Sequence, residues 1–265
     1  MFGESIDAVL KGAESKLGFM KSNPLGYFMA SAIAGMFITF GSMISMSIGG
    51  YLTALMGPAA KIGAAIAFAA ALSMVITAGC ELFTGNNLTV GMLGIDKPRR
   101  WGEIAGLWAY CWLGNLVGSW ITIAVYHYAG ADTVACVSQY FAKVSASKVS
   151  FTPLQMVLRG ILCNVLVCLA VWCAVRLKEE SAKLIMTVWC ILVFMVCGFE
   201  HSVANMSIIG IALLNPCGEA ITWAGYAKSL GFVTLGNILG AVVMLALPYY
   251  LMAGKREGGQ VASMA

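Results

Sequence analysis

The sequence predicts an all-α integral membrane protein with six transmembrane helices. Apolar residues make up 60% of its 265 residues and charged residues only 11%, whereas a soluble domain carries about 25% charged residues. The charges also leave six apolar runs, each near the length of about 20 residues that a crossing needs. We therefore expect one membrane domain at 25–253, an N-terminal segment at 1–24 and a C-terminal tail at 254–265.

Each predicted crossing is an apolar run bounded by charged or turn-forming residues. The runs lie at about 25–48, 62–80, 104–131, 153–175, 184–214 and 229–253. The first two are separated by a glycine-rich turn at Gly49, Gly50 and Gly57-Pro58, and Pro153 suits the first position of a helix. An even number of crossings places both termini on the same side.

The positive charges decide which side this is. Alternating crossings give eleven Lys and Arg residues to the side of the termini and five to the other, and the richer side is normally cytoplasmic. The five on the poorer side are Lys61, Lys143, Lys148, Arg159 and Lys228. We therefore expect both termini in the cytoplasm.

Other features exclude several classes of function. The net charge of +4 includes no clustered basic face of the kind that binds nucleic acid. The nine cysteines match no zinc-binding spacing, so we expect no metal and no cofactor. Seven cysteines lie in apolar runs as small buried hydrophobes, while Cys136 and Cys217 lie in predicted external loops, where a disulfide between them stays open.

The chain contains an internal repeat of three crossings. Gly79, Glu81 and Asn86 recur at the same spacing as Gly198, Glu200 and Asn205, and the run LGN at 113–115 recurs at 235–237. An odd number of crossings per repeat inverts the second copy in the membrane. Both glycine–glutamate motifs interrupt an apolar run, so crossings two and five are predicted to be broken helices.

Paired breaks in inverted repeats point to a site near the membrane midplane. A break exposes backbone N–H groups at the start of the second half-helix, and such N-termini attract anions. The alternative is that the glycines only allow close helix packing. The repetition of the whole motif favours the broken-helix interpretation.

Three ionisable residues lie deep in apolar sequence, where they are costly and are functional candidates. Glu81 and Glu200 are expected to accept hydrogen bonds from unpaired N–H groups at the breaks, with proton relay as the alternative. His201 stands where the first repeat has Leu82, so the scaffold does not demand it. It is predicted to bind or protonate a passing anion; a hydrogen-bonded core histidine is the alternative.

Four runs stand out along the chain: NPLG at 23–26, GCELFTG at 79–85, WLGNLVG at 112–118 and GFEHSVANM at 198–206. Together they resemble the formate/nitrite transporter family over essentially the whole chain. The resemblance implies an aquaporin-like bundle in each subunit of a homopentamer, with one pore per subunit. It also implies a transport protein, not an enzyme, in a bacterial inner membrane.

The same resemblance assigns roles to single residues. His201 and Thr84 become the central pair of the pore, and Lys148 a cation of the external vestibule, in a loop. Asn164 and Asn237 become polar residues of the pathway, although bracing of the backbone is an alternative for them and the better one for Asn115. The residues implied in hydrophobic constrictions are Phe68, Leu72, Leu82 and Phe194.

The implied substrates are small monovalent anions of weak acids, with hydrosulfide, formate and nitrite as the candidates. In the expected mechanism, Lys148 attracts the anion, which is protonated or neutralised near His201 and Thr84. The neutral acid then crosses the constrictions, because an apolar constriction rejects a bare ion. At higher pH the same route could conduct the anion itself.

Residues 4–20 have two alternative roles. They plug the cytoplasmic mouth as a gate, with Lys16 as a contact, or they rest as an amphipathic segment on the membrane lipid.

Two other classes of function are alternatives. An aquaporin-like facilitator of neutral solutes would carry Asn-Pro-Ala boxes at the breaks, and the similar run at 215–217 lies in a loop. A polytopic membrane enzyme, or a haem protein, would need more clustered ligands than His127 and His201 provide.

Overall fold

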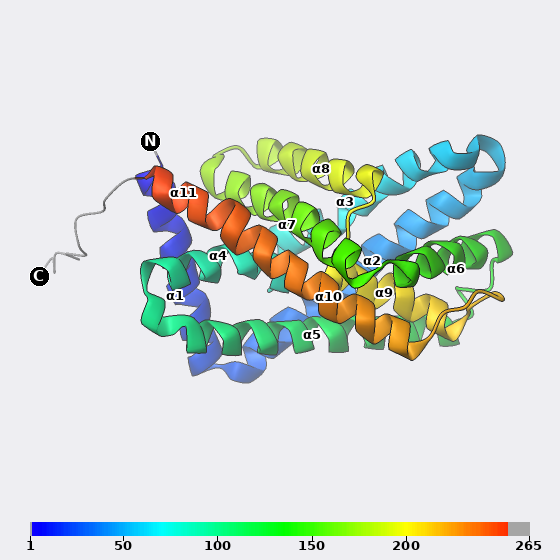
Figure 1. Ribbon diagram of the computed structural model, residues 1–265, viewed down its shortest axis with the longest axis horizontal. Helices are drawn as coiled ribbons and strands as arrows, with labels where there is room; N and C mark the ends of the chain where they lie inside the picture. The colour runs from blue at the N-terminus through cyan, green and yellow to red at the C-terminus, as the bar shows by residue number, and fades with distance from the viewer. Residues whose placement is uncertain (1, 254–265) are drawn as a thin grey trace, which may run out of the picture.

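The computed structural model describes residues 2–253, and these residues form helices and short connections without a strand. The expected C-terminal tail at 254–265 lies outside the described residues. Most helices run roughly along one common direction, whereas α1 lies across one end of the bundle, the end that also holds the N-terminus and α11 (Figure 1). Their bounds are α1 Gly3–Ser22, α2 Pro24–Met56, α3 Ala60–Ala78, α4 Phe83–Asp96, α5 Trp101–Tyr128, α6 Ala135–Ser150, α7 Pro153–Arg176, α8 Glu180–Cys197, α9 Ser202–Leu214, α10 Trp223–Ala241 and α11 Leu247–Met252.

Both interruptions lie where the repeat predicts them. The second apolar run divides into α3 and α4, and the fifth divides into α8 and α9. Figure 1 shows α3 and α4 continuing one another in one direction, and α8 and α9 continuing one another in the opposite direction. The two half-helix pairs therefore approach the middle of the molecule from opposite ends.

Four helical stretches are long and apolar enough to cross a membrane by length and composition alone. They are Pro24–Ala78, Pro153–Arg176, Glu180–Cys197 and Trp223–Met252. The first stretch contains both α2 and α3, joined by the 3-10 turn η1, Gly57–Ala59. The third predicted crossing, α5, has 28 residues but is not among these stretches, and it carries several Trp and Tyr residues with polar groups.

The predicted turn at Gly49 and Gly50 was wrong, because α2 continues through both glycines to Met56. These glycines instead allow α6 to approach. A Cβ at Gly49 would lie 2.3 Å from Tyr140 Cε1, and one at Gly50 would lie 2.7 Å from the Cys136 carbonyl oxygen. The helix α6 was itself expected to be a loop, and its apolar residues are buried on one side.

The last predicted crossing also differs from the expected bounds. It begins at Trp223, where Thr222 accepts a hydrogen bond from the Gly225 amide as an N-cap. It then passes through a π-helical segment, η3, at Val242–Ala246 before α11.

Close contact between α2 and α5 depends on small residues. A Cβ at Gly118 of α5 would lie 1.8 Å from the carbonyl oxygen of Ala32, which is backbone and cannot move aside. In a membrane, where helices gain little from the hydrophobic effect, such close packing is a main source of association. The LGN motif of α5 lies on the same contact, since Gly114 faces Ser31.

Replacing Gly118 with alanine is expected to destabilise the protein by about 3 kcal/mol, the upper end of the usual cost of overpacking. Gly106→Ala is the matched control on the same helix, because nothing lies within 4 Å of a Cβ there. Thermal unfolding in detergent, followed by tryptophan fluorescence, measures both. A lower midpoint for Gly118→Ala alone agrees with the packing, and equal midpoints contradict it.

Candidate functional site

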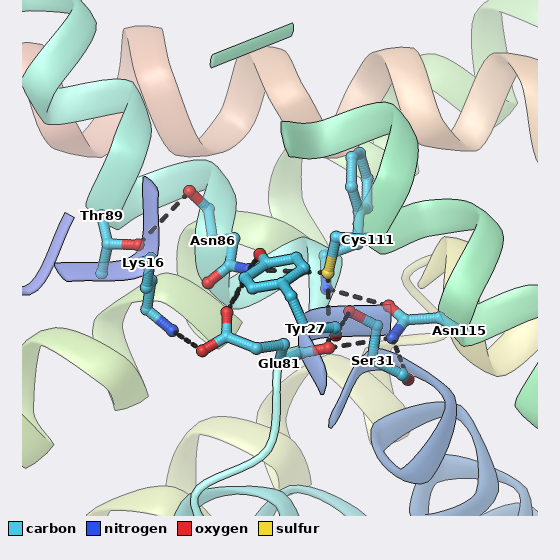
Figure 2. Close-up of polar contacts among 9 residues, drawn as sticks. Lys16, Tyr27, Ser31, Glu81, Asn86, Thr89, Cys111 and Asn115 are labelled. Atoms are coloured by element: carbon cyan, nitrogen blue, oxygen red, sulfur yellow. Dashed lines mark hydrogen bonds and ion pairs between the residues drawn. The ribbon is translucent and has the colours of Figure 1, made fainter. Parts of the chain in front are cut away.

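The first break lies between α3 and α4 and is held by side chains of neighbouring helices. Gly79 ends α3 in the left-handed conformation, with φ 71° and ψ 38°, which favours glycine. The Phe83 amide at the start of α4 donates to Asn115 Oδ1 over 2.9 Å. Asn115 Nδ2 in turn donates to the carbonyl oxygens of Ser31 and Glu81, as Figure 2 shows.

The second break repeats this construction. Gly198 ends α8 with φ 73° and ψ 37°, and the Ser202 amide at the start of α9 donates to Asn237 Oδ1 over 2.9 Å. Asn237 Nδ2 donates to the carbonyl oxygens of Gly160 and Glu200. The bracing role expected for Asn115 is confirmed, and the same contacts favour bracing over pathway lining for Asn237.

Glu81 and Glu200 do not bind the backbone N–H groups at the breaks, so that predicted reason for their presence was wrong. The Glu81 carboxylate accepts from Lys16 Nζ at 2.6 Å, from Tyr27 and from Asn86 (Figure 2). The Glu200 carboxylate accepts from Lys148 Nζ at 2.9 and 3.0 Å and from Asn205 at 2.7 Å. At each break the side-chain oxygen of Asn115 or Asn237 accepts the first N–H of the second half-helix, and each carboxylate binds a lysine instead.

His201 and Thr84 meet at the point where the two breaks face each other. His201 Nε2 lies 2.9 Å from Thr84 Oγ1, and both residues are buried. His201 also caps α9, because its Nδ1 accepts from the Ala204 amide at 3.0 Å. Leu82 occupies the equivalent extended position before α4 and cannot make such a cap.

These two contacts define the form of the imidazole. Since Nδ1 accepts a backbone N–H, a neutral ring carries its hydrogen on Nε2 and donates it to Thr84. A second hydrogen on Nδ1 would point at the Ala204 N–H and break the cap. The Thr84 hydroxyl has no acceptor of its own among the described hydrogen bonds, so its hydrogen can be donated to a solute.

A cavity of about 590 Å³ leads to this pair from the end of the molecule that holds η1 and α6. Its lining includes Phe194, Gly198, Glu200 and His201. Lys148 also lines it, in α6 and not in the predicted loop. The cavity therefore ends at the second break, beside the histidine.

The predicted constriction residues are all buried close to the two breaks. The rings of Phe68 and Phe194 meet edge to face with centroids 6.0 Å apart, and Phe194 stacks on His201 at 6.1 Å. Leu72 lies one turn after Phe68 on α3, and Leu82 directly precedes α4. Apolar groups thus adjoin the histidine and the threonine.

Asn164 of α7 is a polar neighbour of Thr84. Its Nδ2 lies 3.3 Å from the Thr84 carbonyl oxygen and 3.4 Å from Asn87 Oδ1. Two buried atoms of this group, Asn87 Nδ2 and Asn164 Oδ1, lack a hydrogen-bond partner in the described structure. Sequence reasoning missed Asn87, whose only signal was its place in the first glycine–glutamate motif.

The N-terminal helix α1 covers the opposite end of the bundle. Its apolar residues Ile6, Val9, Ala13 and Leu17 are at most 1% exposed and pack against α4, α2, α5 and α7. This apolar face is therefore used inside the protein, which contradicts the alternative of a segment resting on lipid. Lys16 reaches from α1 to Glu81.

A partly exposed cluster of charges at the α1 end of the molecule holds α1 to the turn between α4 and α5. Glu14 pairs with Lys97 at 2.9 Å and with Arg100, and Glu103 pairs with Lys21 at 2.8 Å and with Arg100 at 2.9 Å. The hydrogen bond from Arg100 holds the pKa of Glu14 below its ordinary value. Glu14 therefore favours the docked helix only while it is ionised.

Docking of α1 is expected to weaken as the pH falls below about 4.5, the ordinary pKa of Glu14. A lowered pKa contributes stability that is present above this value and lost as the pH falls through the folded-state pKa. The effect should stay below about 1 kcal/mol because the pair is partly exposed. Hydrogen exchange of α1 measures it, and Glu14→Gln should show the faster exchange already at pH 7; identical exchange in both proteins would contradict the role of this pair.

Three further cations, which sequence reasoning used only to orient the chain, line the cavity. Lys61 of α3 and Arg159 of α7 both face it, as does Lys143 of α6. With Lys148, four cations share a cavity in which Glu200 is the single carboxylate among the described lining residues. The only feature of the sequence that could have indicated this grouping of cations is that the predicted topology places all four on the same side of the membrane.

The exposed cysteines Cys136 and Cys217 are both free, so no disulfide joins them.

A helical membrane bundle with two facing half-helix breaks defines a class of transport protein, and comparison with known proteins names the family. The family described as "Formate/nitrite transporter" matches residues 3–251. The chain belongs to this family of membrane transport proteins, which are not enzymes.

Relatives and solved structures agree with this membership. The chain is 34% identical to "Nitrite transporter NirC" of Salmonella typhimurium, over 97% of this chain and 94% of the relative. It is 28% identical to "Formate channel FocA" of Escherichia coli K12, with 87% of each chain covered. The structure matches an "FNT family ion channel" with a TM-score of 0.87 at 33% identity, covering 95% of this chain and 99% of the other.

A second solved structure, "Pentameric formate channel with formate bound", matches with a TM-score of 0.78 at 25% identity. It covers 89% of this chain and 99% of the other. The fold is therefore the fold of a multi-pass membrane channel.

Proposed function

We propose that the protein passes small monovalent anions of weak acids, with formate, nitrite and hydrosulfide as the candidates, across a bacterial inner membrane. The observation that carries this proposal is the contact between His201 and Thr84, at the end of a cation-lined cavity and between two inverted helix breaks. The names of the nitrite and formate relatives support the substrate class. The path runs inside each subunit, and the subunits form a homopentamer, as in the pentameric structural relative.

The proposed topology has six crossings and both termini in the cytoplasm. α3 with α4 forms the second crossing, and α8 with α9 forms the fifth, so that the two repeats of three crossings are inverted. The end of the molecule that holds α1 is then cytoplasmic, and the cavity opens to the external side. The excess of Lys and Arg at the α1 end supports this orientation.

The cations of the outer cavity lower the cost of bringing an anion to the break, because a cavity lined by one sign of charge concentrates counter-ions. Beyond it, the apolar groups of Phe68, Phe194, Leu72 and Leu82 would strip water from the solute, which strongly favours the neutral acid. The hydroxyl of Thr84 and the Nε2–H of His201, which is donated to Thr84 while no solute is present, replace part of the lost hydration as hydrogen-bond donors. On this proposal the anion takes up a hydrated proton from the solution that fills the cavity, through the ordinary acid–base equilibrium of the substrate, since proton transfer from a neutral imidazole would leave an imidazolate.

This proposal changes one step of the expected mechanism. Protonation by His201 itself would require an imidazolium, and the cap from Ala204 to Nδ1 opposes that form. The histidine acts instead as a neutral donor. The step in which the neutral acid crosses the constrictions is unchanged.

Stopped-flow flux into proteoliposomes tests the function. Formate, nitrite and hydrosulfide are compared at pH 6 and pH 8 with a pH dye inside the vesicles, and empty vesicles are the control. We expect flux of at least one anion above the control, faster at pH 6, with acidification of the interior when the anion enters with a proton, because the neutral acid dissociates again inside the vesicle. Flux of glycerol or urea without flux of any of these anions would favour the alternative of a facilitator of neutral solutes.

A further inference from the structure

Lys61 and Arg159 converge on the second helix break. A methyl group at Gly198 would lie 3.2 Å from Lys61 Nζ and 3.5 Å from Arg159 Nη1. Lys61 is the second residue of α3 and Arg159 lies in the first half of α7, so two separate helices bring these cations together. Both nitrogens are therefore within reach of one small anion beside Gly198, in the lining of the outer cavity.

Neither cation is neutralised by a carboxylate. Among the described residues, Lys148 holds the Glu200 carboxylate with two contacts, and no ion pair within 4.0 Å involves Lys61 or Arg159. Lys148 is thus largely compensated, whereas the positive charge beside Gly198 is not. Uncompensated charge in a recess attracts anions more strongly than a completed ion pair does.

The guanidinium of Arg159 is held in place before any anion arrives. Its Nη1 donates to the Gly198 carbonyl oxygen at 2.6 Å, and its Cζ lies 4.0 Å from the ring centre of Phe151, in a cation–π contact. A guanidinium carries five N–H donors in a fixed plane, and the described structure gives the others no acceptor. A fixed fork of this kind is suited to an anion with two oxygen atoms.

We propose that Lys61 and Arg159 form an anion-binding site at the outer mouth, separate from Lys148, that takes monovalent anions with two acceptor oxygens. Carboxylates and nitrite belong to this class, and hydrosulfide, with a single sulfur atom, does not. The site rests on the proposed function, and it narrows the substrate to oxyanions. It binds the anion one step before the constriction at Phe194 and His201.

Conservative variants test the preference for anions with two oxygen atoms over hydrosulfide. The quantity measured is the half-saturation concentration, the concentration of each anion that gives half-maximal flux when the anion is added on the cavity side. Arg159→Lys keeps the charge and a donor for Gly198 but loses the planar fork. We expect it to raise the half-saturation concentration of formate and nitrite about tenfold, as for one charged hydrogen bond, without changing that of hydrosulfide. Lys61→Gln should raise it about threefold, because this lysine is exposed.

Lys178→Gln is the matched control, since Lys178 is an exposed cation in the connection between α7 and α8, at the opposite end from the cavity (Figure 1). Its half-saturation concentrations should equal those of the unmodified protein. An equal change for all three anions in Arg159→Lys, or no change, would overturn the proposal.

A binding measurement separates this site from transport itself. Saturation-transfer NMR with formate on detergent-solubilised protein detects weak binding whether or not the pore conducts. We expect a clear signal for the unmodified protein and for Lys178→Gln, and a weaker one for Lys61→Gln combined with Arg159→Lys. If these NMR signals are found but the proteoliposomes show no anion flux, the site is retained and the proposed function is rejected. Equal NMR signals in all proteins would reject the site.

Discussion

Replacing Glu200 with alanine is expected to lower the free energy of unfolding by about 3 to 5 kcal/mol, the usual cost of removing one partner of a buried ion pair. The Glu200 side chain is 3% exposed and that of Lys148 is 14% exposed. Without the carboxylate, Lys148 loses its counter-charge and Asn205 Nδ2 loses its contact of 2.7 Å. Thermal unfolding in detergent should show a midpoint several degrees lower.

The control for this prediction is Glu180→Ala. Glu180 also pairs with a lysine, Lys183 at 2.8 Å, but its side chain is 81% exposed. Exposed pairs contribute about 0 to 1 kcal/mol, so the midpoint should hardly change. In a double-mutant cycle, the variant that combines Glu200→Gln with Lys148→Gln should be more stable than Glu200→Gln alone, because it leaves no unpaired buried charge. Equal unfolding midpoints for Glu200→Ala and Glu180→Ala would refute the buried pair.

Replacing His201 with asparagine is expected to lower anion flux about tenfold or more while the shape of the pH profile stays the same. An asparagine can still cap α9 by accepting from the Ala204 amide, so the break should remain folded. The donor to Thr84 and to the anion is lost, and a hydrogen bond to a charged group contributes about 1.5 to 3 kcal/mol, which corresponds to about tenfold or more in rate.

Flux from pH 5 to pH 8 distinguishes the two roles of the histidine. If His201 is a neutral donor, the pH dependence comes from the acid–base equilibrium of the substrate and persists in His201→Asn. If His201 gives its proton to the anion, the substitution abolishes or inverts the dependence. The second outcome would contradict the tautomer that the Ala204 and Thr84 contacts define.

Much of the fold could be predicted because the membrane imposes simple rules. Apolar runs placed most of the long helices, and the repeat of Gly79 and Glu81 at Gly198 and Glu200 placed both breaks. Gly49 and Gly50 were misread as a turn, since a glycine that ends a helix and one that admits a neighbouring helix look alike in sequence. The helix α6 was missed because its lysines and serines resemble a loop.

The candidate residues of the site came from the sequence, but the contacts that they make could not be predicted from it. Symmetry singled out His201, because Leu82 takes its place in the other repeat. The contact of His201 with Thr84, the hydrogen bonds of Asn115 and Asn237 at the breaks and the meeting of Lys61 with Arg159 join residues far apart in the chain. No local pattern in the sequence reports such contacts.

Anion flux through Leu82→Phe tests most directly whether the path runs inside each subunit between the two breaks. Leu82 is buried next to Thr84, and a slightly larger ring there should narrow the path. We predict that formate and nitrite flux into proteoliposomes falls at least about tenfold relative to the unmodified protein, in line with the strong size dependence of narrow pores, while the oligomer elutes unchanged. Undiminished flux from an intact oligomer would place the path outside the breaks and contradict this account.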